Sequence, residues 1–579
     1  MGSMSYNSYE DLLGNKPIDE PRRMRVICIG AGVSGILTAI RFPREIPNLD
    51  LVVYEKNSDV GGTWLENCYP GVRCDIPSAG YQFTFEDNPA WTEFYASGEE
   101  IQAYWTRTAR KYGVYKYCQF NHRFEGARWN EMQGQWEVTL HNNVTGQPVI
   151  DTADFVISAT GLLNRREYPK IPGLETFTGP KMHTARWDSN IELENKRIAL
   201  IGAGSTGIQI LPSIQPIVQR VDHYVRGQNW ISPLGIGGEE LIRRKNQTGN
   251  FKHSPEELWE FRHTPGTYHA FRHRIEGDIN QAPYAVFTDH PAQEALHALT
   301  LQSMKAKLES KPRVAEALTP QWPVGCKRLT PGPGYLEACC KSNVDYINTP
   351  IKSIGPDSIE TADGTIRETD VIICATGFNV TRTGGPQWIG RGGATLDTVW
   401  NPDPVAYISL FPPEMPNMFI YFGPNGGPLT GSTMHMLEWS CEYMIKTIQK
   451  CQREYIRSIS ASKRAITGFQ DHCEKFFDRT VFMKECPSWF KRGQAKGRQV
   501  TSWPGSGVHA RQALLNPRWE DFDYEYLDSV ADIPLGWMGN GMTVAQVQGT
   551  KTTDYLDPPI VPQYAAVEQD SSSNGNGIC

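Results

Sequence analysis

The sequence predicts an α/β fold built on two parallel sheets, with a helical insertion in the second. Two predicted strands, 25–29 and 196–201, each run into a Gly-x-Gly-x-x-Gly turn and then into a helical pattern. Short apolar strands without alternation are typical of parallel sheets that are buried on both faces. Gly30 and Gly202, which open the two turns, are 172 residues apart. We therefore interpret them as two copies of one strand–turn–helix unit and not as a solenoid.

The other elements follow from local patterns. Between 235 and 325 the strand pattern stops, and Ser254 to Glu257 form a capping box with Pro at the first helical position, so this stretch is predicted to be a helical insertion. The polar start, 1–23, is predicted to be an arm, and the Pro-, Ser-, Asn- and Gly-rich end, 556–579, a disordered tail. Further strands are predicted at 51–54, 136–140, 155–158, 221–225 and 371–377, and helices at 36–41, 89–113 and 435–453.

Composition excludes several classes of function. With 57 basic and 64 acidic residues, the formal net charge is −7, which argues against a nucleic-acid binder. No run of about 18 apolar residues is present, so no membrane span is expected. The start of the chain lacks the pattern of a secretory signal, which favours the cytoplasm. The 13 cysteines include no Cys-x-x-Cys pair, so we expect reduced thiols and no metal site.

The first glycine motif is predicted to hold a dinucleotide. Gly30 permits the tight turn, Gly32 lets a pyrophosphate approach the backbone, and Gly35 lets helix and strand pack closely. The helix N-terminus attracts the phosphate charge. Glu55 ends the next strand and can accept hydrogen bonds from a ribose whose 2′-hydroxyl is free. The candidate binding residues here also include Val33, Ser34 and Lys56.

In the second motif, the strand that follows the glycine turn ends at a basic residue and not at an acidic one. After Gly202, Gly204 and Gly207, the strand 221–225 runs into Arg226. A cation at this place suits a 2′-phosphate and favours NADP over NAD, although most arginines are solvated surface residues. Two such sites in one chain are best explained by FAD and NADPH, between which hydride passes. Ser205 and Thr206 complete the second set of candidate binding residues.

These motifs divide the chain into segments. Each sheet is expected to be assembled from two separate stretches of sequence, with the active site where the two domains face each other. The predicted segments are the arm 1–23, the FAD-binding domain in 24–170 and 385–555, the NADP-binding domain in 171–234 and 326–384, the helical insertion 235–325, and the tail 556–579.

A segment between the two motifs resembles a known fingerprint. The stretch 177–188 is similar to the FxGxxxHxxxW(P/D) fingerprint of type I Baeyer–Villiger monooxygenases, which are class B flavoprotein monooxygenases. The resemblance implies that His183 couples domain movement to the position of the nicotinamide and is not a proton-transfer group. The fingerprint residues are Phe177, Gly179, His183, Trp187 and Asp188.

Other segments resemble the same family. The stretch 69–75 is similar to the segment that bears an active-site aspartate, here Asp75, and 325–331 to the segment of the catalytic arginine, here Arg328. The resemblance implies that Asp75 holds Arg328 in place and that Lys327 lies with Arg226 at the 2′-phosphate. It also implies cofactor contacts by Gly62, Thr63, Trp64, Asp75, Tyr81, Lys327 and Arg328.

The chain departs from many family members at 331–336. This variant, with 503–506 and 518–522, looks like the fungal subgroup that acts on bulky polycyclic or steroid-like ketones. The resemblance implies that FAD, NADPH and O2 are used to insert one oxygen atom next to a ketone carbonyl, giving an ester or lactone in secondary metabolism. The partners are then a small ketone and O2, and a monomer is favoured. Three alternatives stay open: N- or S-oxygenation, an uncoupled NADPH oxidase, and a non-enzymatic FAD scaffold.

Overall fold

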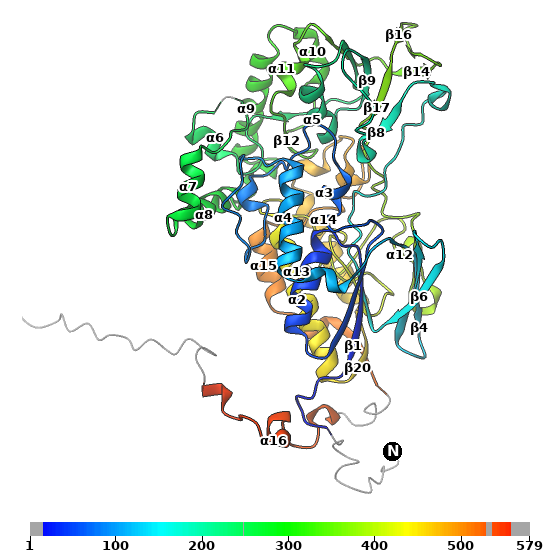
Figure 1. Ribbon diagram of the computed structural model, residues 1–579, viewed down its shortest axis with the longest axis vertical. Helices are drawn as coiled ribbons and strands as arrows, with labels where there is room; N and C mark the ends of the chain where they lie inside the picture. The colour runs from blue at the N-terminus through cyan, green and yellow to red at the C-terminus, as the bar shows by residue number, and fades with distance from the viewer. Residues whose placement is uncertain (1–15, 247, 528–534, 557–579) are drawn as a thin grey trace, which may run out of the picture.

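The first sheet carries the first glycine motif. The computed structural model describes residues 16–246, 248–527 and 535–556. The sheet is parallel, with the order β19-β7-β1-β2-β3. Its strands are β1 (Met24–Ile29), β2 (Leu49–Tyr54), β3 (Cys118–Gln119), β7 (Phe155–Ser158) and β19 (Met418–Ile420). Three helices cover it, α2 (Val33–Glu45), α4 (Gly98–Lys111) and α13 (Thr433–Arg453), and their apolar faces share one core with the strands (Figure 1).

The second sheet carries the second glycine motif. It is also parallel, with the order β13-β10-β9-β17-β8. It lies at the upper end of the molecule in Figure 1, beyond the first sheet. Its strands and the helices on it are β8 (Lys181–His183), β9 (Arg197–Ile201), β10 (Arg220–Tyr224), β13 (Val344–Ile347), β17 (Val371–Cys374), α5 (Ser205–Ile214) and α11 (Tyr335–Cys339).

Smaller elements complete the two units. β18 (Gln387–Ile389), which follows the last strand of the second sheet in sequence, pairs with β4 and so returns the chain to the first unit. The remaining strands are β4 (His122–Asn130), β5 (Gln135–Asn142), β6 (Pro148–Ala153), β11 (Ile231–Ser232), β12 (Thr330–Pro331), β14 (Ile351–Ile354), β15 (Ser358–Thr361), β16 (Ile366–Glu368), β20 (Ile456–Ala461) and β21 (Phe522–Tyr526). The remaining helices outside the insertion are α3 (Thr63–Glu66), α12 (Leu396–Val399), α14 (Lys463–Phe477), α15 (Gly507–Leu515) and α16 (Val544–Gln548).

The stretch from 235 to 325 is helical, as predicted. The Ser254 hydroxyl accepts from the Glu257 amide, and the Glu257 carboxylate accepts from the Ser254 amide, so the expected capping box is confirmed. Within the described residues, no helix has the length and apolar character needed to cross a membrane. The helices of the insertion are α6 (Glu239–Arg243), α7 (Pro255–His263), α8 (Thr267–Ile279), α9 (Pro291–Lys307) and α10 (Pro312–Leu318).

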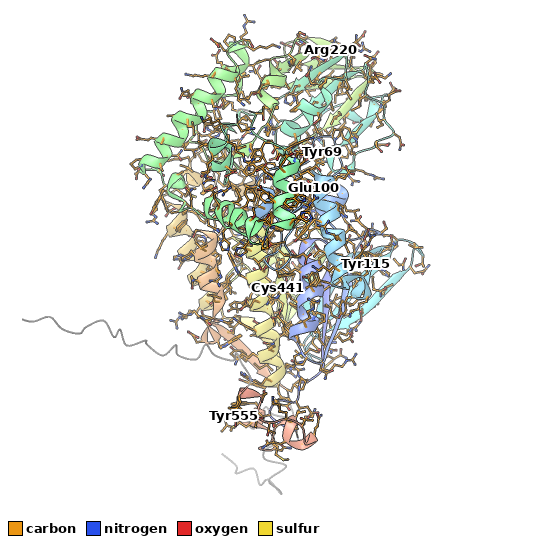
Figure 2. The ribbon with its side chains drawn as sticks, turned by 60° about the vertical axis from the view of Figure 1, so that its left-hand side comes forward. Tyr69, Glu100, Tyr115, Arg220, Cys441 and Tyr555 are labelled. Carbon is orange, nitrogen blue, oxygen red and sulfur yellow. A yellow bond between two sulfur atoms is a disulfide. The ribbon has the colours of Figure 1, made fainter. Side chains whose placement is uncertain are left out.

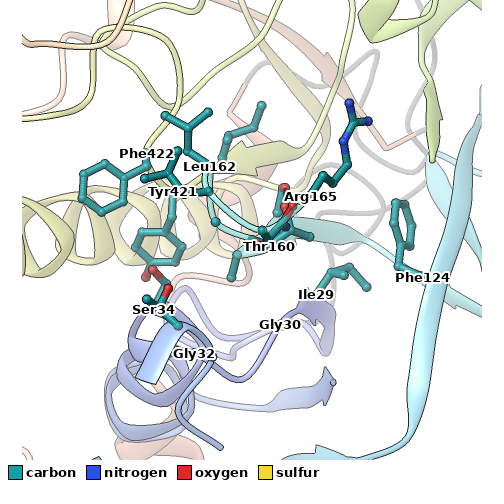
Figure 3. Close-up of a pocket in the computed structure, with 18 of the residues that line it drawn as sticks. Ile29, Gly30, Gly32, Ser34, Phe124, Thr160, Leu162, Arg165, Tyr421 and Phe422 are labelled. Atoms are coloured by element: carbon teal, nitrogen blue, oxygen red, sulfur yellow. Dashed lines mark hydrogen bonds between the residues drawn. The ribbon is translucent and has the colours of Figure 1, made fainter. Parts of the chain in front are cut away.

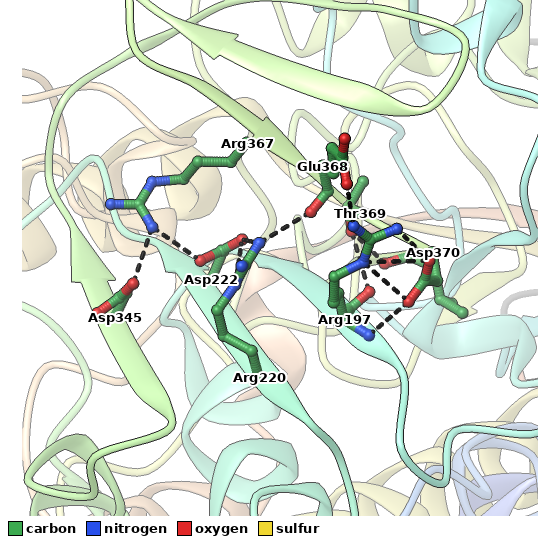
Figure 4. Close-up of polar contacts among 9 residues, drawn as sticks. Arg197, Arg220, Asp222, Asp345, Arg367, Glu368, Thr369 and Asp370 are labelled. Carbon is green, nitrogen blue, oxygen red and sulfur yellow. Dashed lines mark hydrogen bonds and ion pairs between the residues drawn. The ribbon is translucent and has the colours of Figure 1, made fainter.

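An ionic network joins strands of the second sheet at the strand ends opposite the glycine motif (Figure 4). The buried carboxylate of Asp222 lies 2.9 Å from Arg220 and 3.2 Å from Arg367, and Arg367 also pairs with Asp345 at 2.8 Å. Two guanidinium groups thus offset the cost of burying this carboxylate. In the same network, Arg197 pairs with Asp370 at 2.7 Å. Arg197 and Arg220 are the first residues of β9 and β10, so the network lies at the amino-terminal ends of these strands. We therefore assign it to sheet stability and not to the active site.

Two expectations need correction, and two others lie largely outside the described residues. The predicted arm, 1–23, is described only from residue 16. The helix expected at 89–113 begins only after its N-cap Ser97, because 89–97 packs as a loop in which the Phe94 amide bonds to Phe251. The expectation that all cysteines are reduced is wrong for one pair, because Cys326 and Cys486, 160 residues apart, form a disulfide. The predicted disordered tail begins at 556, and 557–579 lie outside the described residues.

Candidate active site

Backbone geometry explains the glycines of the first motif. Gly30 has a φ of +110°, and a Cβ there would lie 2.6 Å from the carbonyl oxygen of Ala159, which directly follows the neighbouring strand β7. A Cβ at Gly35 would lie 2.0 Å from the carbonyl oxygen of Gly30. Both distances are shorter than any real carbon–oxygen contact. The turn is therefore restricted to glycine, and its path brings the backbone to the start of α2, where an anion is favoured.

The Glu55 carboxylate holds the glycine turn by a hydrogen bond to its backbone. Its side chain is buried, one carboxylate oxygen accepts from the Ala31 amide at 2.7 Å, and the other accepts from the Asn57 amide at 2.9 Å. Burial raises the pKa of Glu55, and these two backbone hydrogen bonds oppose the rise. A carboxylate has about four lone-pair sites, so this geometry still leaves acceptor capacity for a ribose hydroxyl. Neighbouring Lys56 pairs with Glu66 at 2.7 Å instead of facing the turn.

A cavity of about 510 Å³ lies over the carboxyl edge of the first sheet (Figure 3). Its long shape follows from its walls, which run from the end of β2, across the glycine turn, to the end of β19 and the start of α13. It is large enough for a cofactor and mixes apolar walls with a few polar groups, as ligand sites do. Of the predicted cofactor contacts, it is lined by Gly30, Gly32, Val33, Ser34, Glu55, Lys56, Gly62, Thr63, Trp64 and Tyr81.

The second motif repeats the first in space as well as in sequence. Gly202 has a φ of +108°, and a Cβ there would lie 2.4 Å from the carbonyl oxygen of Ala375. A Cβ at Gly207 would lie 2.1 Å from the carbonyl oxygen of Gly202, whereas the space beside Gly204 is open. The open space allows a pyrophosphate to approach the backbone there. Ser205 lies 3.2 Å from Thr330 through their hydroxyls, so this turn also contacts the Arg328 segment.

Two cations lie together beyond β10. Lys327 donates to the carbonyl of Gln228 at 3.1 Å and lies 4.7 Å over the ring of Trp322. Burial, and secondly the charge of Arg226, lowers the pKa of Lys327 to about 8. No carboxylate of the described residues forms an ion pair with Lys327 or Arg226. The pair therefore forms a positive site that a 2′-phosphate would neutralise.

Arg328 points the other way, toward Asp75. Its Nε and one terminal nitrogen each donate to an oxygen of Asp75 at 2.7 Å. This bidentate geometry is the strongest form of side-chain ion pair. The charge of Asp75 raises the pKa of Arg328, so the guanidinium stays protonated. Tyr81, which accepts from the indole of Trp64 at 3.1 Å, is the next polar group beside this pair.

The loop that carries Asp75 is held against the second unit. The Tyr69 hydroxyl donates to Gln209 in α5 at 2.8 Å, and the Gln209 amide donates to the carbonyl of Arg73 at 3.1 Å. A Cβ at Gly71 would lie 2.5 Å from the carbonyl of Gln209, so the loop touches the helix backbone. Figure 2 shows Tyr69 between Arg220 of the second unit, above it, and Cys441 of the first unit, below it. Gln209 was missed by sequence reasoning, because a helical glutamine carries no signal of this contact.

His183 lies beside the segments that connect the two units. It ends β8, is fully buried, and its Nε2 lies 3.0 Å from the carbonyl of Gly377. Because its Nδ1 accepts from the Ala185 amide, Nε2 is the protonated nitrogen and the imidazole is neutral. Burial lowers the pKa of His183, which favours the same form. The two segments that connect the units run side by side here, since the backbone amide of Asn379 donates to the carbonyl of Arg165.

The other fingerprint residues are more dispersed. Phe177 is buried in the core on one face of the second sheet, and Gly179 packs against its ring. Trp187 packs on the core of the other face. Asp188 is exposed and accepts from the amide of Asn190, which is the contact of a turn residue.

The disulfide directly precedes the two basic residues. Cys326 is bonded to Cys486, whose loop is wrapped around the buried ammonium of Lys491. That ammonium donates to the carbonyl oxygens of Lys484 and Ala495. The Lys327–Arg328 segment is therefore tied covalently to the 484–495 loop. No sequence signal distinguishes this pair among 13 cysteines.

Comparison with known proteins agrees with this geometry. Residues 23–234 match the flavin-binding monooxygenase-like family. The chain is 37% identical to the FAD-binding monooxygenase tazF of Aspergillus terreus over 90% of this chain and 92% of that one, and 32% identical to a Baeyer–Villiger monooxygenase of Streptomyces coelicolor over 84% and 90%. Its fold is similar to that of NADP+-bound cyclohexanone monooxygenase from Rhodococcus sp. Phi1, with a TM-score of 0.75 and 25% identity over 88% of this chain and all of that one. The chain belongs to the flavin-binding monooxygenase family, among the relatives of the Baeyer–Villiger enzymes.

Proposed function

We propose that this flavin-dependent monooxygenase is a Baeyer–Villiger enzyme that uses FAD, NADPH and O2. It inserts one oxygen atom next to the carbonyl of a ketone and releases an ester or lactone. The observation that carries the proposal is the bidentate Arg328–Asp75 pair, which two distant segments bring together beside the flavin cavity. Bulky cyclic or polycyclic ketones are the proposed substrates, on the basis of the 331–336 and 503–506 segments.

The two units would hold the two cofactors. Strand membership supports an FAD-binding domain from 24–170 and 385–555 and an NADP-binding domain from 171–234 and 326–384. The glycine turn at Gly30 and the start of α2 would bind the pyrophosphate of FAD, and Glu55 its adenosine ribose. Arg226 and Lys327 would bind the 2′-phosphate of NADPH. When bound, FAD takes hydride from NADPH and activates dioxygen.

Arg328 would stabilise the negative charge of the reaction. A guanidinium remains protonated and presents donors in a fixed plane, so it needs no reorganisation as charge develops on the reacting oxygens. Asp75 would orient Arg328 and raise its pKa further, without touching the ketone. His183 would transmit domain movement and not protons, because its neutral ring is buried and both of its nitrogens are hydrogen-bonded.

A product analysis tests the proposal. The purified holoenzyme is incubated with NADPH and a bulky cyclic ketone, an alkyl sulfide or a tertiary amine, and product masses and hydrogen peroxide are measured. We expect a lactone one oxygen atom heavier than the ketone, with one NADPH consumed for each product. Oxidation of only the sulfide or amine would assign the alternative, N- or S-oxygenation. Hydrogen peroxide equal to the NADPH consumed with every substrate would assign an oxidase.

A further inference from the structure

One arginine in the wall of the flavin cavity has no counter-charge. Arg382 follows the second crossing between the units and donates to the carbonyl oxygens of Phe422, at 2.8 Å, and Gly423, at 3.4 Å. No carboxylate of the described residues pairs with it. Burial alone lowers the pKa of Arg382 to about 10. The side chain is half-buried and lines the cavity, so a cation with no counter-charge is only partly removed from water here.

Arg22 is a second half-buried arginine, and its contacts are those of a structural residue. Arg22 also donates to two main-chain carbonyls, of Ile456 at 2.8 Å and of Cys451 at 3.4 Å. It does not line the cavity, and the negative charge of Asp154 partly offsets its burial. Arg382 has the same two carbonyl bonds without such an offset, and it faces a cofactor site. The missing negative charge is therefore expected to come from what the cavity binds.

The position of Arg382 indicates which half of FAD would lie beside it. The strand order runs from β2, which ends at Glu55, through β1 and β7 to β19, which leads to Phe422. Figure 3 shows Tyr421 and Ser34 facing one another beside the glycine turn, with Phe422 beyond. With the adenosine at Glu55 and the pyrophosphate at the glycine turn, the β19 side of the cavity receives the flavin mononucleotide half.

We propose that Arg382 is the cation that neutralises the flavin mononucleotide half of bound FAD. Two groups on this half carry negative charge: its phosphate in both redox states, and the isoalloxazine ring when it is reduced and anionic. Both would bind a guanidinium by the same charge-assisted hydrogen bonds. The inference rests on FAD binding by the family and not on the ketone reaction, so the failure of one leaves the other standing.

The test compares three variants of the full chain. Arg382→Gln removes the charge and keeps a donor for Phe422, and Arg382→Lys keeps the charge. Arg22→Gln is the control for loss of a half-buried arginine bound to carbonyls. Two quantities are measured for each holoenzyme: the dissociation constant of oxidised FAD, from flavin fluorescence after dilution, and the midpoint potential of the bound flavin. Neither readout depends on turnover.

Each source of charge gives its own result. If the phosphate is the partner, Arg382→Gln weakens binding of oxidised FAD at least tenfold, with the loss largest at low salt. If the reduced ring is the partner, oxidised FAD binds as before and the midpoint potential falls by at least about 30 mV, which is the tenfold equivalent for two electrons. In both cases Arg382→Lys, which keeps the charge, should have an FAD affinity and a midpoint potential close to those of the wild-type protein. The proposal is overturned if Arg382→Gln matches Arg22→Gln in both quantities.

Discussion

The pH dependence of NADP+ binding tests the predicted phosphate site directly. Lys327 has a pKa of about 8 in the ligand-free protein because it is buried beside Arg226. The 2′-phosphate carries close to two negative charges above pH 7, and it prefers the ammonium form of Lys327. Because the free pKa is depressed, the ammonium is present below pH 8 and is lost as the pH rises through 8. Binding of NADP+ should therefore weaken by less than about twofold between pH 7 and 8 and by about tenfold for each pH unit well above 8.

The size of the effect follows from that pKa. With a free pKa of about 8 and a higher pKa in the complex, the dissociation constant rises roughly thirtyfold between pH 7 and 9.5, which is about 2 kcal/mol. NAD+ lacks the 2′-phosphate, so its affinity should not change over this range. Isothermal titration calorimetry with NADP+ and NAD+ at several pH values measures both without turnover.

Lys327→Arg is the matched control, because arginine keeps its charge throughout this range. It should bind NADP+ with an almost flat pH profile. If the wild-type protein and Lys327→Arg lose affinity in parallel, or if NAD+ shows the same decline, Lys327 is not the phosphate ligand and the assignment is wrong.

Three further predictions concern the rest of the site. Arg328→Ala should leave flavin reduction by NADPH intact in anaerobic stopped-flow but lower ketone oxygenation by about 100-fold or more, and normal product yield would refute its role. Cys486→Ser should lower the unfolding free energy in urea by about 2–4 kcal/mol, because the disulfide closes a long loop, and the wild-type protein measured with reductant should match the variant. His183→Phe leaves the Gly377 carbonyl without this partner, so it should lower the free energy of unfolding by about 1–3 kcal/mol and slow hydride transfer from NADPH to the flavin. An unchanged rate of hydride transfer would limit the histidine to a structural role.

Local chemistry made the two glycine motifs predictable. Gly30 and Gly202 open turns whose geometry depends on a few consecutive residues, and the turn, the helix start and the following strand all leave marks in sequence. The helix boundary at Ser97 was missed for the opposite reason. Aromatic residues before it, such as Trp91, repeat at helical spacing but are buried in a loop by tertiary contacts.

Contacts between distant segments could not be derived from residue patterns. Arg328 and Asp75 are 253 residues apart, and only a family resemblance paired them. Arg382 was not identified, because an arginine in a polar linker gives no sign that it lines a cavity without a counter-charge. Such features are set by how the sheets meet, and that depends on the topology of the whole chain.

Lys327 and Arg328 place the proposed active site at the contact between the two units. Lys327 lies beside Arg226, whereas Arg328, the next residue, pairs with Asp75. The loop of Asp75 is held to the second unit by Gln209, and to the first by backbone bonds such as that from Cys74 to Ala96. A rotation of the two units must therefore strain one of these attachments before it separates Arg328 from Asp75. The bidentate pair is consequently expected to persist while the nicotinamide changes position, which is what a cation required in successive steps of one reaction needs.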